Sequence, residues 1–153
     1  MPATDARFGS DLRLLRDLER QNDRDRGSDL SAIPRPETGQ VDLETLSGAD
    51  NLKQALLLRF MTPVGELAPL GHPDYGSRLF ELIGERNIET NRNRAKLFVL
   101  QALAAEPRVK EVRSVRVTQN RADRGRVDIE VSLVPIDGET VLNLVFPFFL
   151  REA

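Results

Sequence analysis

Apolar residues in the last third of the chain recur at every second position, which is the pattern of a strand with one buried face. The alternation is strictest over 126–134, where polar residues separate Val127, Ile129, Val131 and Leu133. Val115 and Val117 indicate another strand over 113–119, and the polar segment 120–125 is the turn between the two. The pattern predicts two antiparallel strands joined by this turn.

A third strand is predicted over 139–150, after the short hairpin signal Asp137-Gly138. One of its faces carries Leu142, Leu144, Phe146, Phe148 and Leu150. The other face carries the apolar residues Val141, Val145 and Phe149. Pro147 is typical of an edge strand, because proline cannot donate a backbone hydrogen bond. An edge strand that is apolar on both faces predicts pairing with another chain. Alternatively, the N-terminal arm or residues 41–46 cover it within the same molecule.

Upstream of this sheet, two segments show the spacing of apolar residues that a helix requires. The stronger one spans 88–105 and ends before Pro107; its apolar face consists of Ala95, Phe98, Val99, Ala102 and Leu103. The earlier helix, over 49–61, is apolar almost all round and must be covered on several sides. Ser47 and Asp50 fit a capping box at its start.

A long loop follows the first helix and carries three Pro and three Gly residues over 62–77. Loops of this length are often functional. We expect a short helix over 77–83, which Gly84 ends. Helices that pack on one face of a C-terminal three-stranded antiparallel meander make an α+β domain.

The first 40 residues differ in composition from the rest. Phe8, Leu12, Leu15 and Leu18 form a thin apolar stripe on a short predicted helix. The Pro and Gly residues over 27–40 oppose regular structure, and 41–46 is a predicted short strand. We therefore expect a flexible N-terminal arm and linker over 1–40 and a folded domain over 41–153. The arm is either mobile or folds on a neighbouring molecule.

Charge and length exclude several classes of function. The 153 residues suit one ordinary domain, and the net charge of −2 gives no overall attraction to nucleic acid or to an anionic membrane. No apolar run is long enough to span a bilayer, and the first residues lack the apolar core of a secretory signal. The expected compartment is the cytoplasm, with neither nucleic acid nor membrane as a partner.

Candidate catalytic chemistry is sparse. The chain has no Cys, and His72 is its only His, so neither a metal-ligand spacing nor a Ser-His-Asp arrangement is apparent. We expect no catalytic, metal or cofactor site. The alternative is a glycosidase, for which Glu66 and Asp74 share the long loop. Such a reaction needs two carboxyl groups about 5–10 Å apart, which the sequence does not establish.

Five runs of the chain follow one another over about residues 41–150: SGADNLKQALLLRFMTPVGELAPLGHPDYGSRL, ERNIETNRNRAKLFVLQAL, AEPRVKEVRSVRV, RVDIEVSLVPI and LNLVFPF. In this order they resemble the W-like or gene-25-like baseplate wedge proteins. These belong to contractile-tailed phages and to contractile injection particles. The most specific points are the triplet Glu106, Pro107 and Arg108, and the Asp-Tyr-Gly loop. The resemblance assigns residues 41–153 to a baseplate wedge domain.

The resemblance implies a structural subunit without enzymatic activity or cofactor, assembled in the cytoplasm as part of a phage tail or tail-like particle. Some members of the family carry a lysozyme label. The implied partners are sheath subunits, other wedge proteins, and inner tube or hub proteins. Sheath subunits join the terminal strand by strand exchange, which makes partner-binding candidates of Val141, Asn143, Val145 and Phe149.

The resemblance also implies that Glu106, Pro107 and Arg108 dock on other wedge subunits. From the residues alone, two interpretations of this triplet remain open. It is either a helix stop with a local Glu/Arg pair, or a site from which Arg108 reaches a carboxylate of a partner.

Overall fold

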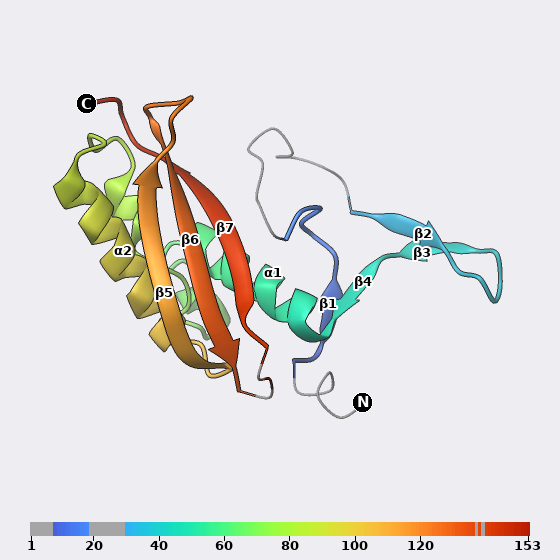
Figure 1. Ribbon diagram of the computed structural model, residues 1–153. Coiled ribbons are helices and arrows are strands. Elements are labelled where there is room, and N and C mark those ends of the chain that lie inside the picture. Colours follow the sequence, from blue (N-terminus) through green and yellow to red (C-terminus); the bar gives the residue numbers. More distant parts are fainter. Residues whose placement is uncertain (1–7, 19–29, 137, 139) are drawn as a thin grey trace.

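The computed structural model describes residues 8–18, 30–136, 138 and 140–153. Its C-terminal part is a three-stranded antiparallel sheet (Figure 1), formed by β5 (Val109–Gln119), β6 (Arg126–Pro135) and β7 (Leu142–Phe149) in that order. This order confirms the predicted meander, with β7 at an edge.

The alternation in β6 and β7 places the predicted residues on the buried face. Those with almost no exposed surface are Val127, Ile129, Val131, Leu133, Leu142, Leu144 and Phe146. Leu133 lies opposite Leu142, which is the register that a connection centred between positions 137 and 138 requires. Asp137 and Glu139 themselves lie outside the described residues.

Strand β5 begins well before the predicted residue 113. Val109 pairs with Pro135, and the register then shifts between Val109 and Glu111 and again between Val112 and Ser114. Such bulges insert an extra residue and break the period of two. Because the alternation of apolar and polar residues is irregular there, the sequence did not indicate the first part of this strand.

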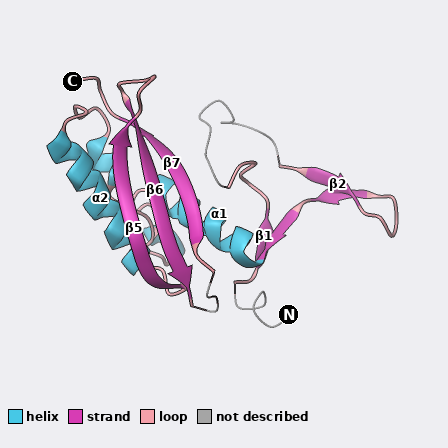
Figure 2. Ribbon diagram, viewed as in Figure 1, coloured by secondary structure: helices cyan, strands magenta, loops and turns pink. Residues whose placement is uncertain are grey.

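Two α-helices, α1 (Gly48–Met61) and α2 (Glu89–Ala104), lie behind the sheet in Figure 2. The face of α2 that was predicted to be apolar is buried. The protein is therefore an α+β domain, as predicted. The short helix expected over 77–83 is a 3-10 helix, η4 (Leu79–Leu82), and Gly84 follows it with φ 86°.

Helix α1 is buried on several sides, as its composition predicts. Its fully buried side chains include Leu52, Leu56 and Leu57. The helix begins at Gly48 directly after Ser47, but the Ser47 side chain makes no capping hydrogen bond. The capping-box prediction was therefore right about the boundary and wrong about the interaction. Ser47 belongs to a strand, β4 (Thr45–Ser47), and pairs with Ser10.

Residues 8–18 contain no helix, contrary to the prediction. They contain strand β1 (Ser10–Leu12), which pairs with β4, and both Phe8 and Leu18 are buried in the core. The predicted strand over 41–46 is divided, because β3 (Val41–Leu43) pairs with β2 (Ala32–Pro34) instead. The segment 27–40 thus contributes one strand to a hairpin. In Figure 1 this β2–β3 hairpin projects away from the sheet and helices.

Gln54 attaches the N-terminal segment to α1. Its Oε1 accepts hydrogen bonds from the N–H groups of Leu14 (2.8 Å) and Leu15 (3.1 Å), and its Nε2 donates to the carbonyl of Leu12 (2.8 Å). The Gln54 residue is 1% exposed. One buried amide thereby satisfies three backbone groups of a segment that has only three strand residues of its own.

Replacing Gln54 by Leu is expected to release residues 10–15 from the helix. Leucine keeps the side-chain volume but removes the three hydrogen bonds. We expect the free energy that holds this segment on α1 to fall by about 1–3 kcal/mol. Amide hydrogen exchange checks this. The amides of Leu14 and Leu15 should exchange much faster in the variant, whereas those of β6 should keep their protection. Equal acceleration across the whole chain would contradict this local role.

Candidate functional site

Hydrogen bonds at the end of β7 show which of its residues point their backbone N–H and C=O groups away from β6. The N–H of Leu150 donates to the carbonyl of Gly125 (2.7 Å) on the β6 side, whereas the N–H of Arg151 donates to Glu85 (2.8 Å) on the other side. Backbone groups alternate in direction along a strand. The odd positions of β7 therefore point their N–H and C=O groups away from β6. Pro147 occupies an odd position, so its missing N–H removes no bond to β6.

The candidate residues of the terminal strand share these odd positions. Their exposure varies: Val141 and Asn143 are exposed, and Val145 and Phe149 are half-buried. Across the sheet, Val145 lies opposite Glu130 and Asn143 lies opposite Ser132. Arg126, Asp128, Glu130 and Ser132 make most of this face of β6 polar. The apolar residues of β7 on the same face therefore form a narrow strip along the β7 edge.

The structure shows which segments cover the outer edge of β7 and which do not. Residues 41–46 do not, because β3 and β4 pair with β2 and β1. The segment that includes Glu85 and Asn87 bonds to Arg151 and covers the edge beyond β7. Along 142–149, no strand in the described part of the chain adds to the outer side of β7.

The triplet at 106–108 surrounds a buried carboxylate. Glu106 is 4% exposed. Its Oε2 accepts a hydrogen bond from Arg59 Nη2 (3.0 Å), and its Oε1 accepts one from Arg108 Nε (2.7 Å). Arg108 Nη1 also donates to the carbonyl of Phe8 (3.3 Å), which ties the N-terminal segment to the same cluster. Pro107 is exposed in the turn between α2 and β5.

Burial by itself raises the pKa of Glu106, but the hydrogen bonds and charge of Arg108, together with the hydrogen bond from Arg59, hold that pKa below its ordinary value. The Arg59 guanidinium lies over the ring of Tyr75, with its carbon 4.5 Å from the ring centroid. Burial raises the pKa of the Tyr75 hydroxyl, and the charge of Arg59 opposes this rise. Glu106 is therefore ionised, and Tyr75 neutral, near neutral pH.

Sequence reasoning found Glu106 and Arg108 and singled out the Asp-Tyr-Gly loop that contains Tyr75, but it missed Arg59 and did not place Tyr75 beside the triplet. The signal for Arg59 was present, since it is the one charged residue in the apolar run QALLLRFM. A cation in such a run has to meet a buried anion. Of the triplet, the structure leaves Pro107 and part of Arg108 at the surface, while Glu106 faces the inside of the domain.

The loop over 62–78 is held by its own backbone. Its two ends pair through Ser77 N–H to Thr62 O (2.9 Å) and Val64 N–H to Ser77 O (3.0 Å). The Ser77 hydroxyl donates to Phe60 O (2.8 Å). Within the loop, the 3-10 helix η3 (Ala68–Leu70) forms one turn. These contacts make the loop a folded element of the domain.

The residues considered for catalysis lie on the surface of this loop. His72, Glu66 and Asp74 are all exposed. Across the described ranges, no group of three or more His, Asp or Glu residues is placed to hold a metal ion. Among the helices described, none combines the length and apolar character that a bilayer crossing demands.

Comparison with known proteins gives one informative result. No protein-family model matches the chain, and no curated protein matches it. A solved structure does: a Geobacter sulfurreducens protein with the provisional name tail lysozyme has 28% sequence identity and a TM-score of 0.56. The match covers 65% of this chain and 88% of that chain. The two proteins share one fold. This agrees with the tail-protein resemblance seen in the sequence, at the level of the fold.

Proposed function

We propose that this protein is a structural subunit of the baseplate of a phage tail or related contractile particle, and that it initiates the sheath by accepting a strand at β7. The observation that carries the proposal is the outer edge of β7, to which no strand in the described part of the chain adds along 142–149. Its support is the fold shared with a protein named for a tail. Strand addition uses main-chain hydrogen bonds for affinity and alternating side chains for specificity.

The odd positions of β7 define how a sheath strand would bind. Asn143 and Val145 present N–H and C=O groups to it, while Pro147 presents only a carbonyl. The incoming strand therefore forms its regular ladder before Pro147. Val141 and Val145 provide apolar side chains beside this ladder, and Phe149 continues the strip.

The triplet contributes a second contact in this proposal. Pro107 and the exposed part of Arg108 meet other wedge proteins, and the inner tube or hub proteins are further neighbours. Glu106 acts as a positioning residue, because its carboxylate fixes Arg108 at 2.7 Å without reaching the surface.

A glycosidase is the second candidate, favoured by the name of the Geobacter protein. Glu66 and Asp74 are both exposed, whereas a catalytic acid needs a raised pKa, usually from burial. We therefore propose that the protein is not an enzyme. Purified protein that clears peptidoglycan, and that loses this activity with Glu66→Gln, would favour the glycosidase.

Replacing Val145 by Pro is expected to abolish sheath assembly while the subunit still folds. Proline removes an outward N–H and blocks an incoming strand, but it leaves the hydrogen bonds to β6, as Pro147 already does. Removing residues 141–153 is a poorer test, because Leu142, Leu144 and Leu150 belong to the core.

The matched control is Val145→Thr, which keeps the N–H group and the branched shape. Electron microscopy of particles from cells that express each variant gives the result. Baseplates without sheath for Val145→Pro, and normal sheath for Val145→Thr, are expected. Sheaths of normal length from Val145→Pro would contradict strand addition at this edge.

A further inference from the structure

The β2–β3 hairpin has one face that is entirely apolar. Cross-strand pairing places Ala32 opposite Leu43 and Pro34 opposite Val41. Opposite residues share a face, and Leu30 has the same parity as Ala32. We call Leu30, Ala32, Pro34, Val41 and Leu43 the hairpin face.

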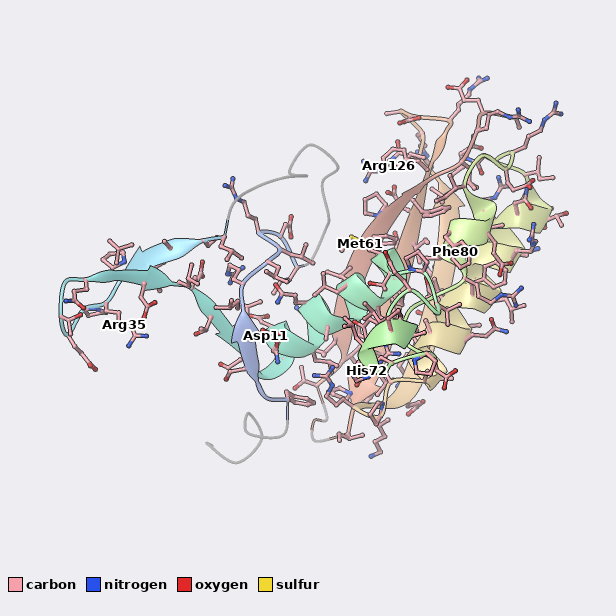
Figure 3. The ribbon with its side chains drawn as sticks, turned by 180° about the vertical axis from the view of Figure 1, so that it is seen from behind. Asp11, Arg35, Met61, His72, Phe80 and Arg126 are labelled. Atoms are coloured by element: carbon pink, nitrogen blue, oxygen red, sulfur yellow. The ribbon has the colours of Figure 1, made fainter. Side chains whose placement is uncertain are left out.

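The described part of the chain leaves the hairpin face open. Val41 is 71% exposed, Leu30 46% and Leu43 41%, and Ala32 and Pro34 are exposed as well. Single exposed apolar residues are common, but a contiguous set on one face indicates a binding surface. The opposite face carries an Arg35–Asp42 ion pair. Figure 3 shows Arg35 at the far end of the hairpin, away from the helices.

The residues outside the described ranges are poor in large apolar side chains. Residues 19–29 contain no aliphatic or aromatic residue, and residues 1–7 contain one large apolar residue, Met1. An isolated two-stranded hairpin is at best marginally stable in water. A partner that buries the hairpin face would stabilise it.

An open hollow of about 560 Å³ continues the hairpin face at its base, lined by Arg13, Arg16, Leu30, Ser31, Ala32 and Glu44. Arg13 is neutralised by Glu44, with Nε and Oε1 2.8 Å apart. Arg16 is exposed and makes no ion pair within the described ranges. The hollow therefore places Arg16, which is unpaired within the described ranges, beside the aliphatic side chains of Leu30 and Ala32. This arrangement favours an anionic group next to aliphatic side chains.

We propose that the hairpin face binds a segment of a neighbouring protein subunit that carries aliphatic side chains and, at the hairpin base, a carboxylate paired with Arg16. Five residues are few against the roughly 20–30 residues a side of a standard interface. Two copies of the hairpin face packed on each other would therefore not hold a dimer alone. The occupant belongs to a subunit that other contacts also hold. This inference goes beyond the proposed function, because it concerns a different surface.

A photoreactive amino acid at position 41 of the full chain tests the proposal in cells that assemble its complex. The matched control is the same group at position 33, because Ile33 is 45% exposed on the opposite face of the hairpin. Position 41 should cross-link to a defined segment of one other subunit, and position 33 should not. Mass spectrometry should locate aliphatic residues and an Asp or Glu in that segment.

Charge reversal then tests the chemistry of the site. Arg16→Glu should lower the yield of the position 41 cross-link by about two- to fivefold, as expected for one exposed ion pair. Changing the mapped acidic residue to Arg should restore it. Arg113→Glu, on the exposed side of β5, should have no effect.

Four results would overturn the proposal: a cross-link back to residues of the same molecule, a cross-link to a second copy of this chain, equal yields from positions 33 and 41, or no cross-link at all. Val145→Pro should leave the position 41 cross-link unchanged even where sheath is absent. The experiments therefore distinguish a failure of the hairpin-face proposal from a failure of the proposed strand addition at β7.

Discussion

Replacing Glu106 by Ala is expected to lower the free energy of unfolding by about 3–5 kcal/mol, the usual result when one partner of a buried ion pair is removed. The Arg59 side chain is 9% exposed and that of Glu106 3%. Without the carboxylate, the Arg59 charge stays in the interior, where Arg59 Nε already has no hydrogen-bond partner. Chemical denaturation of wild type and variant at pH 7 measures the difference.

The matched control is Glu111→Ala. Glu111 pairs with Arg113 at 3.4 Å, but the two side chains are 52% and 57% exposed. Such an exposed pair contributes about 0–1 kcal/mol. A similar loss for both variants would mean that the Glu106 cluster stabilises the fold no more than a surface pair does.

The lowered pKa of Glu106 also predicts a pH dependence of stability. Its stabilising contribution is fully present above the ordinary glutamate pKa of about 4.3 and is lost as the pH falls through the lower pKa of the folded state. The difference in unfolding free energy between wild type and Glu106→Ala should therefore narrow below about pH 4. A constant difference from pH 7 to pH 3 would exclude this explanation.

Replacing Gly76 by Ala is expected to lower the free energy of unfolding by about 3 kcal/mol or more. Gly76 has φ +117°, which costs a residue with a side chain about 1–3 kcal/mol. An added Cβ would also come within 3 Å of backbone atoms of residues 62–64, among them Thr62 O. Those atoms cannot move without breaking the bonds of Thr62 and Val64 to Ser77.

Gly71→Ala separates these two causes. Gly71 has φ +88° in the same loop, but an added Cβ there meets nothing within 4 Å. We expect Gly71→Ala to lower the free energy of unfolding by about 1 kcal/mol, because only the backbone conformation is unfavourable there. Thermal unfolding of both variants checks the prediction, and equal losses would show that the close contact at Gly76 is relieved by movement of the loop.

Elements with a clean period could be predicted from the sequence. The apolar face of α2 and the inward residues of β6 are the ones that the spacing indicates. Elements without a clean period could not. The bulges after Val109 hid the start of β5, and residues 8–18 have helix-like spacing but form β1 because β4 lies beside them.

Of the two candidate binding surfaces, the β7 edge could be predicted from the sequence and the hairpin face could not. Pro147 and the apolar odd positions of the last strand are enough to predict the β7 edge from the sequence alone. The hairpin face was not predicted, because the Pro and Gly residues of the segment 27–40 indicated an irregular linker. Only the pairing of β2 with β3 aligns Pro34 with Val41 on one side.

The sequence by itself determined which side chains share a face, because the periods of helix and strand are properties of the local backbone. It also determined that the last strand lies at an edge, since Pro147 lacks an N–H. Only the tertiary structure decided which distant polar and charged groups meet. Glu106 and Arg59 are 47 residues apart, and Arg108 and Phe8 are 100 residues apart. The packing of helices on the sheet brings such residues together, and no local pattern in the chain specifies that packing.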